Sequence, residues 1–222
     1  MPKFKIHPRA IIFDMDGVIV DSMPYHYLAW YEALRPFGVR ITCFDVYSRE
    51  GERWQKSLED FLRGAHIEPK PATLKKIFKS RQKIFKGYFK RFIFGGVSEF
   101  LNCLKDKGYL LGLVTGTPIV EVEKILPLKM QKLFDCIITG DRVENGKPHP
   151  EPYLKAAKEL KVKQSECVVV ENAPLGIRSA KSAGMFCFAI VTSLPKEYLK
   201  EADMVVNSLE EITGIIDKTC SI

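Results

Sequence analysis

Short apolar runs that alternate with helical stretches dominate the second half of the sequence. Helical periodicity beyond Gly96 predicts helices at 97–107, 118–134 with a break at Pro127, 150–160, 174–183 and 209–217. Apolar runs typical of buried strands lie between them, at 109–115, 136–139, 167–171, 186–191 and 204–206. Strands that alternate with helices form βαβ units with parallel strands and right-handed crossovers. The sequence therefore predicts an α/β fold with a Rossmann-like parallel sheet.

A further strand is predicted at 10–13, and two carboxylates spaced by one residue, Asp14 and Asp16, follow it directly. The run is apolar throughout, as in a central parallel strand covered on both faces, and Gly17 lets the chain turn away. Neighbouring carboxylates repel each other, and a hard divalent cation such as Mg²⁺ would relieve that repulsion. An Asp-rich turn without a cation is the alternative, and this stretch alone does not decide between them.

Residues 23–93 interrupt the alternation, because they show helical periodicity at 23–37, 54–63 and 72–92 and no convincing strand. We therefore predict a small α-helical cap domain at 23–93, inserted into a Rossmann-like core domain of residues 1–22 and 94–222. The last cap helix is rich in lysine, arginine and aromatic residues. It could bind nucleic acid, but the spacing of its aromatic residues favours an ordinary amphipathic helix.

Composition limits the classes of partner and location. With 222 residues, 46% of them apolar, the chain can bury a large core. The formal net charge of +7 favours anionic partners, either nucleic acid or small phosphorylated metabolites. Neither a membrane-spanning run nor a signal-peptide pattern nor a Cys-x-x-Cys pair occurs in the sequence. We expect a cytoplasmic protein that does not bind membranes.

Polar groups follow the other predicted strands where those strands end. Thr115 is followed by Gly116 and Thr117 at the start of a helix, a corner that can bind an anion. Lys147 stands in a proline-rich loop, and the Glu171-Asn172 pair ends another strand. Each group alone has an ordinary explanation, such as a strand-end hydroxyl or a surface charge. Because the carboxyl ends of parallel strands share one sheet edge, together they predict a site for a phosphoryl group beside Mg²⁺.

These motifs resemble those of the haloacid dehalogenase superfamily, in the subgroup with a small helical cap and near its β-phosphoglucomutase and sugar-phosphate phosphatase branch. The first motif of that family matches Asp14 to Ser22, and the second matches Thr115. Lys147, in Gly-Lys-Pro-His-Pro, matches the third, and Glu171-Asn172 matches the fourth. The resemblance covers essentially the whole chain.

The resemblance implies the roles of the main site residues. Asp14 would be the nucleophile that becomes an aspartyl phosphate, and Asp16 the general acid and base. Thr115 and Lys147 would hold the transferring phosphoryl group. Mg²⁺ would be bound by side chains and one backbone oxygen from Asp14, Asp16, Glu171 and Asn172. The family usually has a second acid where this chain has Asn172, so we expect weaker metal binding or a larger ligand role for Glu171.

The resemblance also implies which residues recognise the substrate. His26 would approach Asp16 when the cap closes, and Arg49 would grip a second, non-transferring phosphate. Arg81 or Lys83 is a weaker candidate for that role. Gly116 and Thr117 would contact the substrate from the core.

We therefore predict a Mg²⁺-dependent phosphatase for small phosphorylated metabolites, in particular sugar phosphates, that works as a monomer and does not bind nucleic acid. A phosphohexomutase of the β-phosphoglucomutase type is the main alternative. The amide at Asn172 and the Thr-Gly-Thr sequence at 115–117 favour the phosphatase slightly. A catalytically weak phosphate-binding or regulatory protein is a third possibility.

Overall fold

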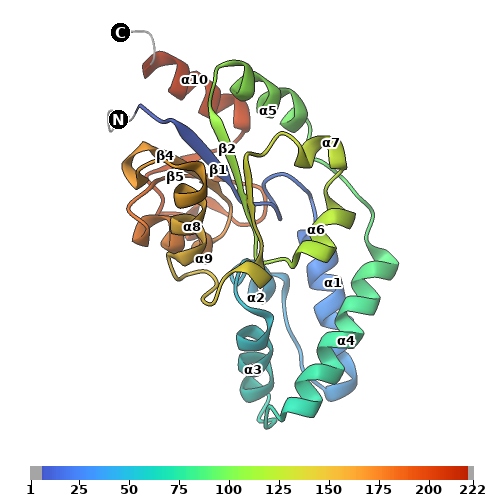
Figure 1. Ribbon diagram of the computed structural model, residues 1–222. Coiled ribbons are helices and arrows are strands. Elements are labelled where there is room, and N and C mark those ends of the chain that lie inside the picture. Colours follow the sequence, from blue (N-terminus) through green and yellow to red (C-terminus); the bar gives the residue numbers. More distant parts are fainter. Residues whose placement is uncertain (1–6, 220–222) are drawn as a thin grey trace.

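The structure is a computed structural model, and it describes residues 7–219, with side chains as far as residue 216. Its centre is a six-stranded sheet in the order β3-β2-β1-β4-β5-β6, in which all neighbouring strands are parallel (Figure 1). The strands are β1 Ala10–Phe13, β2 Leu110–Val114, β3 Cys136–Ile138, β4 Cys167–Glu171, β5 Phe186–Ile190 and β6 Met204–Val206. The predicted α/β fold with a Rossmann-like parallel sheet is confirmed.

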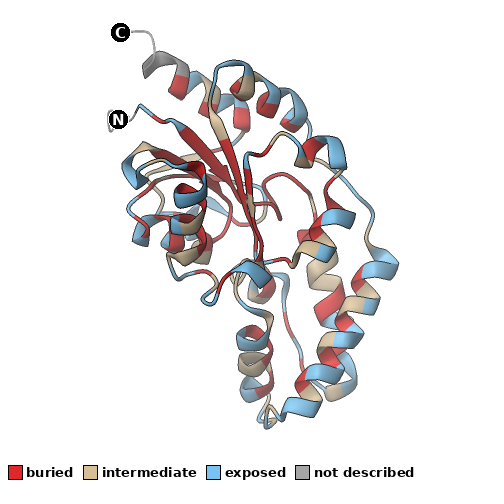
Figure 2. Ribbon diagram, in the orientation of Figure 1, coloured by how far each residue is buried: buried red, intermediate tan, exposed pale blue. Residues whose placement is uncertain are grey.

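Strand β1 lies in the middle of the sheet because both of its faces are apolar. Its side chains alternate between two hydrophobic clusters. Ile11 and Phe13 belong to one cluster, and Ala10 and Ile12 belong to the other. All four are fully buried, and Figure 2 shows the central strands as the most buried part of the chain. This placement carries the two carboxylates after β1 to the middle of the sheet edge.

Helices cover both faces of the sheet. The face with Ile11 and Phe13 packs against α5 (Val97–Asp106), α6 (Ile119–Ile125), α7 (Leu128–Gln131) and α10 (Leu209–Thr219). The opposite face packs against α8 (Glu151–Leu160) and α9 (Pro174–Ser182). The predicted helix at 118–134 is thus two short helices, separated at Pro127 as expected.

The remaining helices lie together below the sheet in Figure 1. They are α1 (Met23–Leu34), α2 (Cys43–Tyr47), α3 (Trp54–Gly64) and α4 (Pro71–Tyr88). Much of their packing is within a third hydrophobic cluster, which includes Trp30, Leu58 and Ile77. We infer that they form the cap, while its predicted limits at 23 and 93 stay a prediction.

Helix α4 is the basic, aromatic helix of the sequence. Its buried side chains include Leu74, Ile77 and Phe85, while Lys75 and Lys79 are exposed. The amphipathic interpretation is therefore confirmed. The helix ends at Tyr88, earlier than the predicted 92, because the chain then extends to an isolated bridge between Val20 and Ile93.

Helix α2 was not predicted from the sequence. This helix begins with a capping box, in which the Thr42 hydroxyl accepts a hydrogen bond from the Asp45 amide at 3.3 Å. In return the Asp45 carboxylate accepts one from the Thr42 amide at 2.7 Å. The Thr-x-x-Asp pattern was visible in the sequence. Helix α2 leads into the segment 48–53, which returns the chain to the sheet edge.

No helix within residues 7–219 is both long enough and apolar enough to cross a bilayer.

Candidate active site

The predicted site residues from the core gather at the carboxyl edge of the sheet. Asp14 and Asp16 follow β1, Thr115 follows β2, and Glu171 is the last residue of β4. Lys147 lies in the loop between β3 and α8. All five side chains are buried, with 4% exposure or less. The parallel topology therefore brings together the residues that the sequence places far apart.

Lys147 links the carboxylates at the centre of the site. Its Nζ donates to Asp14 Oδ1 at 2.5 Å and to Glu171 Oε1 at 2.6 Å. Burial alone would lower the pKa of Lys147, but Asp14 and Glu171 raise it well above its ordinary value. Tyr153 on α8 also donates to Glu171 Oε1, at 2.6 Å. Lys147 is therefore a fixed cation beside Asp14.

Asp14 has one oxygen held and one free. Oδ1 accepts from Lys147, while Oδ2 is buried and has no hydrogen-bond partner among the described residues. Burial raises the pKa of Asp14 well above its ordinary value, and the negative charge of Glu171 adds to this, whereas Lys147 opposes it. A second positive charge would favour the anionic form, and the unpartnered oxygen is available to a ligand or a reacting atom.

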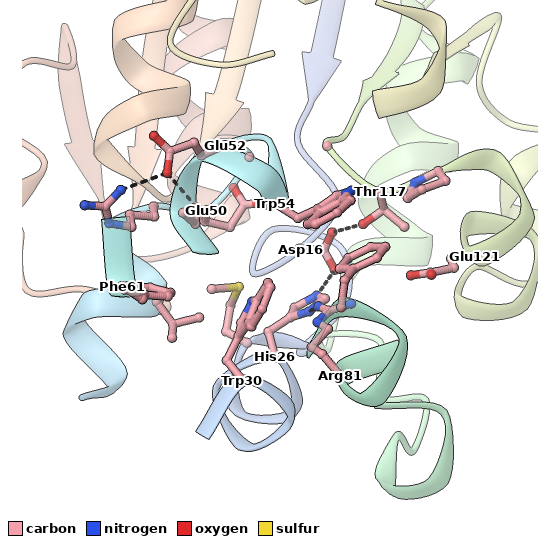
Figure 3. Close-up of a pocket in the computed structure, with 18 residues that line it drawn as sticks. Asp16, His26, Trp30, Glu50, Glu52, Trp54, Phe61, Arg81, Thr117 and Glu121 are labelled. Carbon is pink, nitrogen blue, oxygen red and sulfur yellow. Dashed lines mark hydrogen bonds and ion pairs between the residues drawn. The ribbon is translucent and has the colours of Figure 1, made fainter. Parts of the chain in front are cut away.

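Asp16 is surrounded by hydrogen-bond donors. Oδ1 accepts from the Ser22 hydroxyl at 2.5 Å and contacts His26 Nε2 at 3.1 Å. Oδ2 accepts from the hydroxyl of Thr117 at 3.1 Å (Figure 3) and from that of Thr115 at 3.3 Å. Burial alone would raise the pKa of Asp16, but His26, Ser22 and Thr117 lower it to about 2. Asp16 is therefore an anion in the ligand-free protein.

Arg81 on α4 fixes the orientation of His26. One guanidinium nitrogen of Arg81 contacts His26 Nδ1, and because arginine only donates, Nδ1 accepts. His26 Nε2 then carries a hydrogen and donates it to Asp16. The Arg81 guanidinium lies over the rings of Trp30 and Phe85, at 5.5 and 5.0 Å. The approach of His26 to Asp16 that the resemblance implied is thus present in the structure.

The segment 48–53 of the cap closes one side of the site. The Glu50 side chain is buried at 8% exposure, and its Oε2 has no partner in the described part of the chain. Gly51 has a φ of +78°, and a Cβ added there would lie 2.4 Å from Lys147 Cδ. A Cβ added to Gly116 would likewise lie 3.2 Å from Gly51 Cα. Cap and core backbones therefore meet directly over Lys147.

We expect Gly51→Ala to lower kcat/KM by about tenfold or more, because a left-handed conformation costs a non-glycine residue roughly 1–2 kcal/mol and the methyl group displaces Lys147. Steady-state kinetics on a phosphate ester would measure the change. Gly64→Ala is the matched control, since a Cβ at Gly64 meets nothing within 4 Å. Equal activity in the two variants would contradict a closed cap during turnover.

Arg49 lies at the rim of the pocket that Asp16, His26 and Arg81 also line. Its guanidinium pairs with Glu52 and Asp60, both at 2.9 Å, and lies 5.5 Å from the Phe61 ring centre. Burial alone would lower the pKa of Arg49, but Asp60 and Glu52 raise it. Gly116 and Thr117 line the same pocket, whereas Lys83 lines a separate groove. Both carboxylates are bound through Nη1, so the N–H groups of Nη2 and Nε can still donate to a phosphate.

The sequence analysis did not assign a role to three residues of the site. Ser22 was part of the first motif and holds Asp16. Tyr153 holds Glu171, and the only sequence signal was its place one turn into the helix after the Lys147 loop. Glu50 stands within the Arg-Glu-Gly segment next to Arg49, but nothing in that segment showed which side chain would enter the site.

The family model of haloacid dehalogenase-like hydrolases matches residues 8–184, which include every core residue of this site. The chain belongs to this family. As a haloacid dehalogenase-like hydrolase it is an enzyme, and the predicted resemblance is confirmed.

Relatives within the family include phosphatases and mutases. A "Phosphorylated carbohydrates phosphatase" of Thermotoga maritima is 32% identical over 94% of this chain and 98% of its own length. The "Beta-phosphoglucomutase" of Bacillus subtilis is 29% identical over 92% of each chain. The solved structure of beta-phosphoglucomutase from Clostridium difficile superposes with a TM-score of 0.82 and 27% identity, covering 97% of this chain and 100% of that one.

The oxygens at the sheet edge suit a hard divalent cation. Ligand atoms of Asp14, Glu50 and Glu171 lie within 4.8 Å of one another, and all three residues are buried. Asn172 donates from Nδ2 to Ser193 at 3.0 Å, which leaves its buried Oδ1 without a partner among the described residues. Carboxylate and amide oxygens are the ligands that Mg²⁺ prefers. The donor set of this hydrolase therefore fits Mg²⁺.

Proposed function

We propose that this hydrolase is a Mg²⁺-dependent phosphatase of small phosphorylated metabolites, sugar phosphates in particular, and that it forms an aspartyl phosphate on Asp14. The arrangement of Asp14 carries the proposal. Its carboxylate is fully buried, one oxygen is held by Lys147 at 2.5 Å, and the other oxygen has no partner in the described chain. A second carboxylate, Asp16, stands two positions further along the chain.

The proposed reaction has two steps. In the first, an Asp14 oxygen attacks phosphorus, the ester P–O bond breaks, and Asp16 gives a proton to the leaving oxygen. In the second, Asp16 takes a proton from water as the water oxygen attacks phosphorus, and the bond to Asp14 breaks. Inorganic phosphate leaves and Asp14 is again a carboxylate. Lys147 and Thr115 would bind phosphoryl oxygens, and Lys147 would offset the charge that gathers on them.

The proton that Asp16 gives in the first step must arrive with the substrate. Asp16 is an anion in the free protein, because the hydrogen bonds from His26, Ser22 and Thr117 hold its pKa below the ordinary value of a carboxyl group. A phosphate group bound beside it is a like charge and raises the pKa of a carboxylate. His26 and the hydroxyls of Ser22 and Thr117 hold Asp16 in place during the transfer.

Mg²⁺ would be held by Asp14, the backbone oxygen of Asp16, Glu171 and Asn172. When bound, it would neutralise charge on the phosphate and on Asp14, so that two anions can approach each other. Glu171 is oriented for this role by Lys147 and Tyr153, and its Oε2 also accepts from the Asn172 amide at 3.0 Å.

Substrate class is inferred from the relatives and the pocket. The Thermotoga maritima relative is named for phosphorylated carbohydrates, and relatives with that type of name cover nearly the whole chain. The pocket between cap and core offers Arg81, whose buried Nε has no partner among the described residues, and Arg49 at the rim. A small polar molecule with a phosphate group suits this lining. The monomeric state and the cytoplasmic location stay predictions.

Phosphohexomutase activity is the second candidate, because two of the relatives named above are beta-phosphoglucomutases and because the cap is closed over Lys147. A closed cap excludes water and lets an aspartyl phosphate pass to another hydroxyl.

An assay with β-glucose 1-phosphate and a trace of glucose 1,6-bisphosphate separates the two candidates. We expect release of inorganic phosphate from a panel of sugar phosphates to exceed isomerisation. Near-quantitative conversion to glucose 6-phosphate with little free phosphate would instead identify a mutase. Arg49→Ala should then abolish this conversion.

We expect Asn172→Asp to increase the affinity for Mg²⁺ by about tenfold, because a charged ligand replaces a neutral one. Titration of phosphatase activity with Mg²⁺ measures the change, and Asn102→Asp on the exposed face of α5 controls for charge alone. Unchanged affinity would place residue 172 outside the ligand set.

A further inference from the structure

Glu50 is a carboxylate that the proposed reaction does not use. It lies on the cap segment between α2 and α3 and lines the same pocket as Asp16 and His26 (Figure 3). Its side chain is more than nine-tenths buried. One of its oxygens, Oε2, has no hydrogen-bond partner among the described residues. A buried carboxylate oxygen without a partner is costly unless something binds it.

The surroundings of Glu50 are negative. Ligand atoms of Glu50, Asp14 and Glu171 lie within 4.8 Å of one another. Lys147 is the only cation with an ion pair to this trio in the described chain, and it is already shared between Asp14 and Glu171. One ammonium does not balance the charge of three carboxylates whose side chains are this deeply buried.

Three oxygens are unpartnered at this point of the described structure: Asp14 Oδ2, Asn172 Oδ1 and Glu50 Oε2. The first two belong to residues of the core. The third comes from the cap. Hard oxygen donors of this kind, with an excess of negative charge, are what a divalent cation binds.

We propose that Glu50 is a metal ligand supplied by the cap. The cation held by Asp14 and Glu171 of the core also binds Glu50, which replaces the carboxylate that this chain lacks at Asn172. The inference rests on the Mg²⁺ dependence in the proposed function and adds a ligand to it.

The position of the segment supports this role. Gly51, the neighbour of Glu50, lies close to the core: a Cβ on Gly51 would lie 2.4 Å from Lys147 Cδ, and a Cβ on Gly116 would lie 3.2 Å from Gly51 Cα. Glu50 therefore reaches the core without any rearrangement of the closed cap. If the cation binds Glu50, cation binding stabilises the closed cap. Closure of the cap then increases the affinity for the cation by the same factor.

Direct metal binding tests the proposal without an activity assay. Mn²⁺ replaces Mg²⁺ as the probe, and electron paramagnetic resonance measures free Mn²⁺ during titration of the full-length protein. We expect Glu50→Gln, which keeps the size of the side chain, to weaken the binding of Mn²⁺ by about tenfold or more. Glu59→Gln is the matched control, because it removes the same charge from a residue that pairs with Arg63 on the outer side of α3.

Two further measurements complete the test. The double variant Glu50→Gln/Asn172→Asp should recover most of the Mn²⁺ affinity that Glu50→Gln loses. Hydrogen exchange of the amides of 48–54 should slow on addition of Mg²⁺ in the wild type and not in Glu50→Gln. If circular dichroism shows that Glu50→Gln is misfolded, Glu50→Asp takes its place. We expect Glu50→Asp to bind Mn²⁺ more weakly than the wild type, because its side chain is shorter by one methylene.

Equal Mn²⁺ affinity in Glu50→Gln and Glu59→Gln would overturn the proposal, since Glu50 would then lie outside the ligand set. Absence of Mn²⁺ binding to the wild type would contradict the metal dependence itself. The two failures are therefore distinguishable.

Discussion

Asp14→Asn should abolish phosphatase activity, with a fall in kcat on the order of a thousandfold or more, as expected for loss of a nucleophile. An amide of the same size cannot attack phosphorus, while the surrounding packing is kept. Release of inorganic phosphate from p-nitrophenyl phosphate and from a sugar phosphate measures the effect. Asp14→Asn also removes one of the two carboxylates that Lys147 contacts, so circular dichroism should accompany the kinetics.

Asp106→Asn is the matched control, because Asp106 is exposed at the end of α5. Wild-type turnover in Asp14→Asn would exclude covalent catalysis at this residue. Absence of turnover in the wild type itself, with tight phosphate binding, would instead support a phosphate-binding or regulatory protein.

Asp16→Ala should lower kcat by roughly a hundredfold to ten-thousandfold on sugar phosphates, the range for loss of a general acid and base. The loss should depend on the leaving group. An alkoxide leaving from a sugar phosphate needs a proton, whereas p-nitrophenolate leaves without one. We therefore expect the first step with p-nitrophenyl phosphate to be much less affected than the first step with a sugar phosphate.

Rapid-quench kinetics measures that first step for both substrates. Ser22→Ala serves as a comparison, since it removes one hydrogen bond to Asp16 and leaves the carboxylate in place. An equal loss for both leaving groups in Asp16→Ala would contradict a role in proton transfer and indicate a purely structural role.

The fold could be predicted from the sequence because its determinants are local. Each strand is a short apolar run and each core helix shows its own periodicity, so the parallel sheet and the edge that carries Asp14, Thr115 and Glu171 follow from the order of elements. The short helix α2 was missed because its five residues, Cys43–Tyr47, are too few for a periodic signal. Only its capping box marked it.

The arrangement within the site was less predictable. That Asp16 turns toward Ser22 and His26, while Asp14 turns toward Lys147, depends on side chains from α1 and from the loop before α8. Entry of Glu50 depends on how the cap lies on the core, which the close contact of Gly51 with Gly116 determines. Contacts between distant segments of this kind leave no pattern in a single sequence. The ion pairs of Arg49 with Glu52 and Asp60 were also not predicted, although all three residues lie close together in the sequence.

Trapping of the aspartyl phosphate would show directly whether Asp14 is the nucleophile. Asp16→Ala should form the intermediate from p-nitrophenyl phosphate and hydrolyse it slowly, because the base that activates water is missing. The reaction is stopped with acid during turnover, and peptide mass spectrometry locates the phosphate. We expect phosphate on the peptide that contains Asp14, in an amount that matches the burst of p-nitrophenol. A burst of p-nitrophenol with no phosphate on Asp14, or with phosphate on another residue, would contradict it.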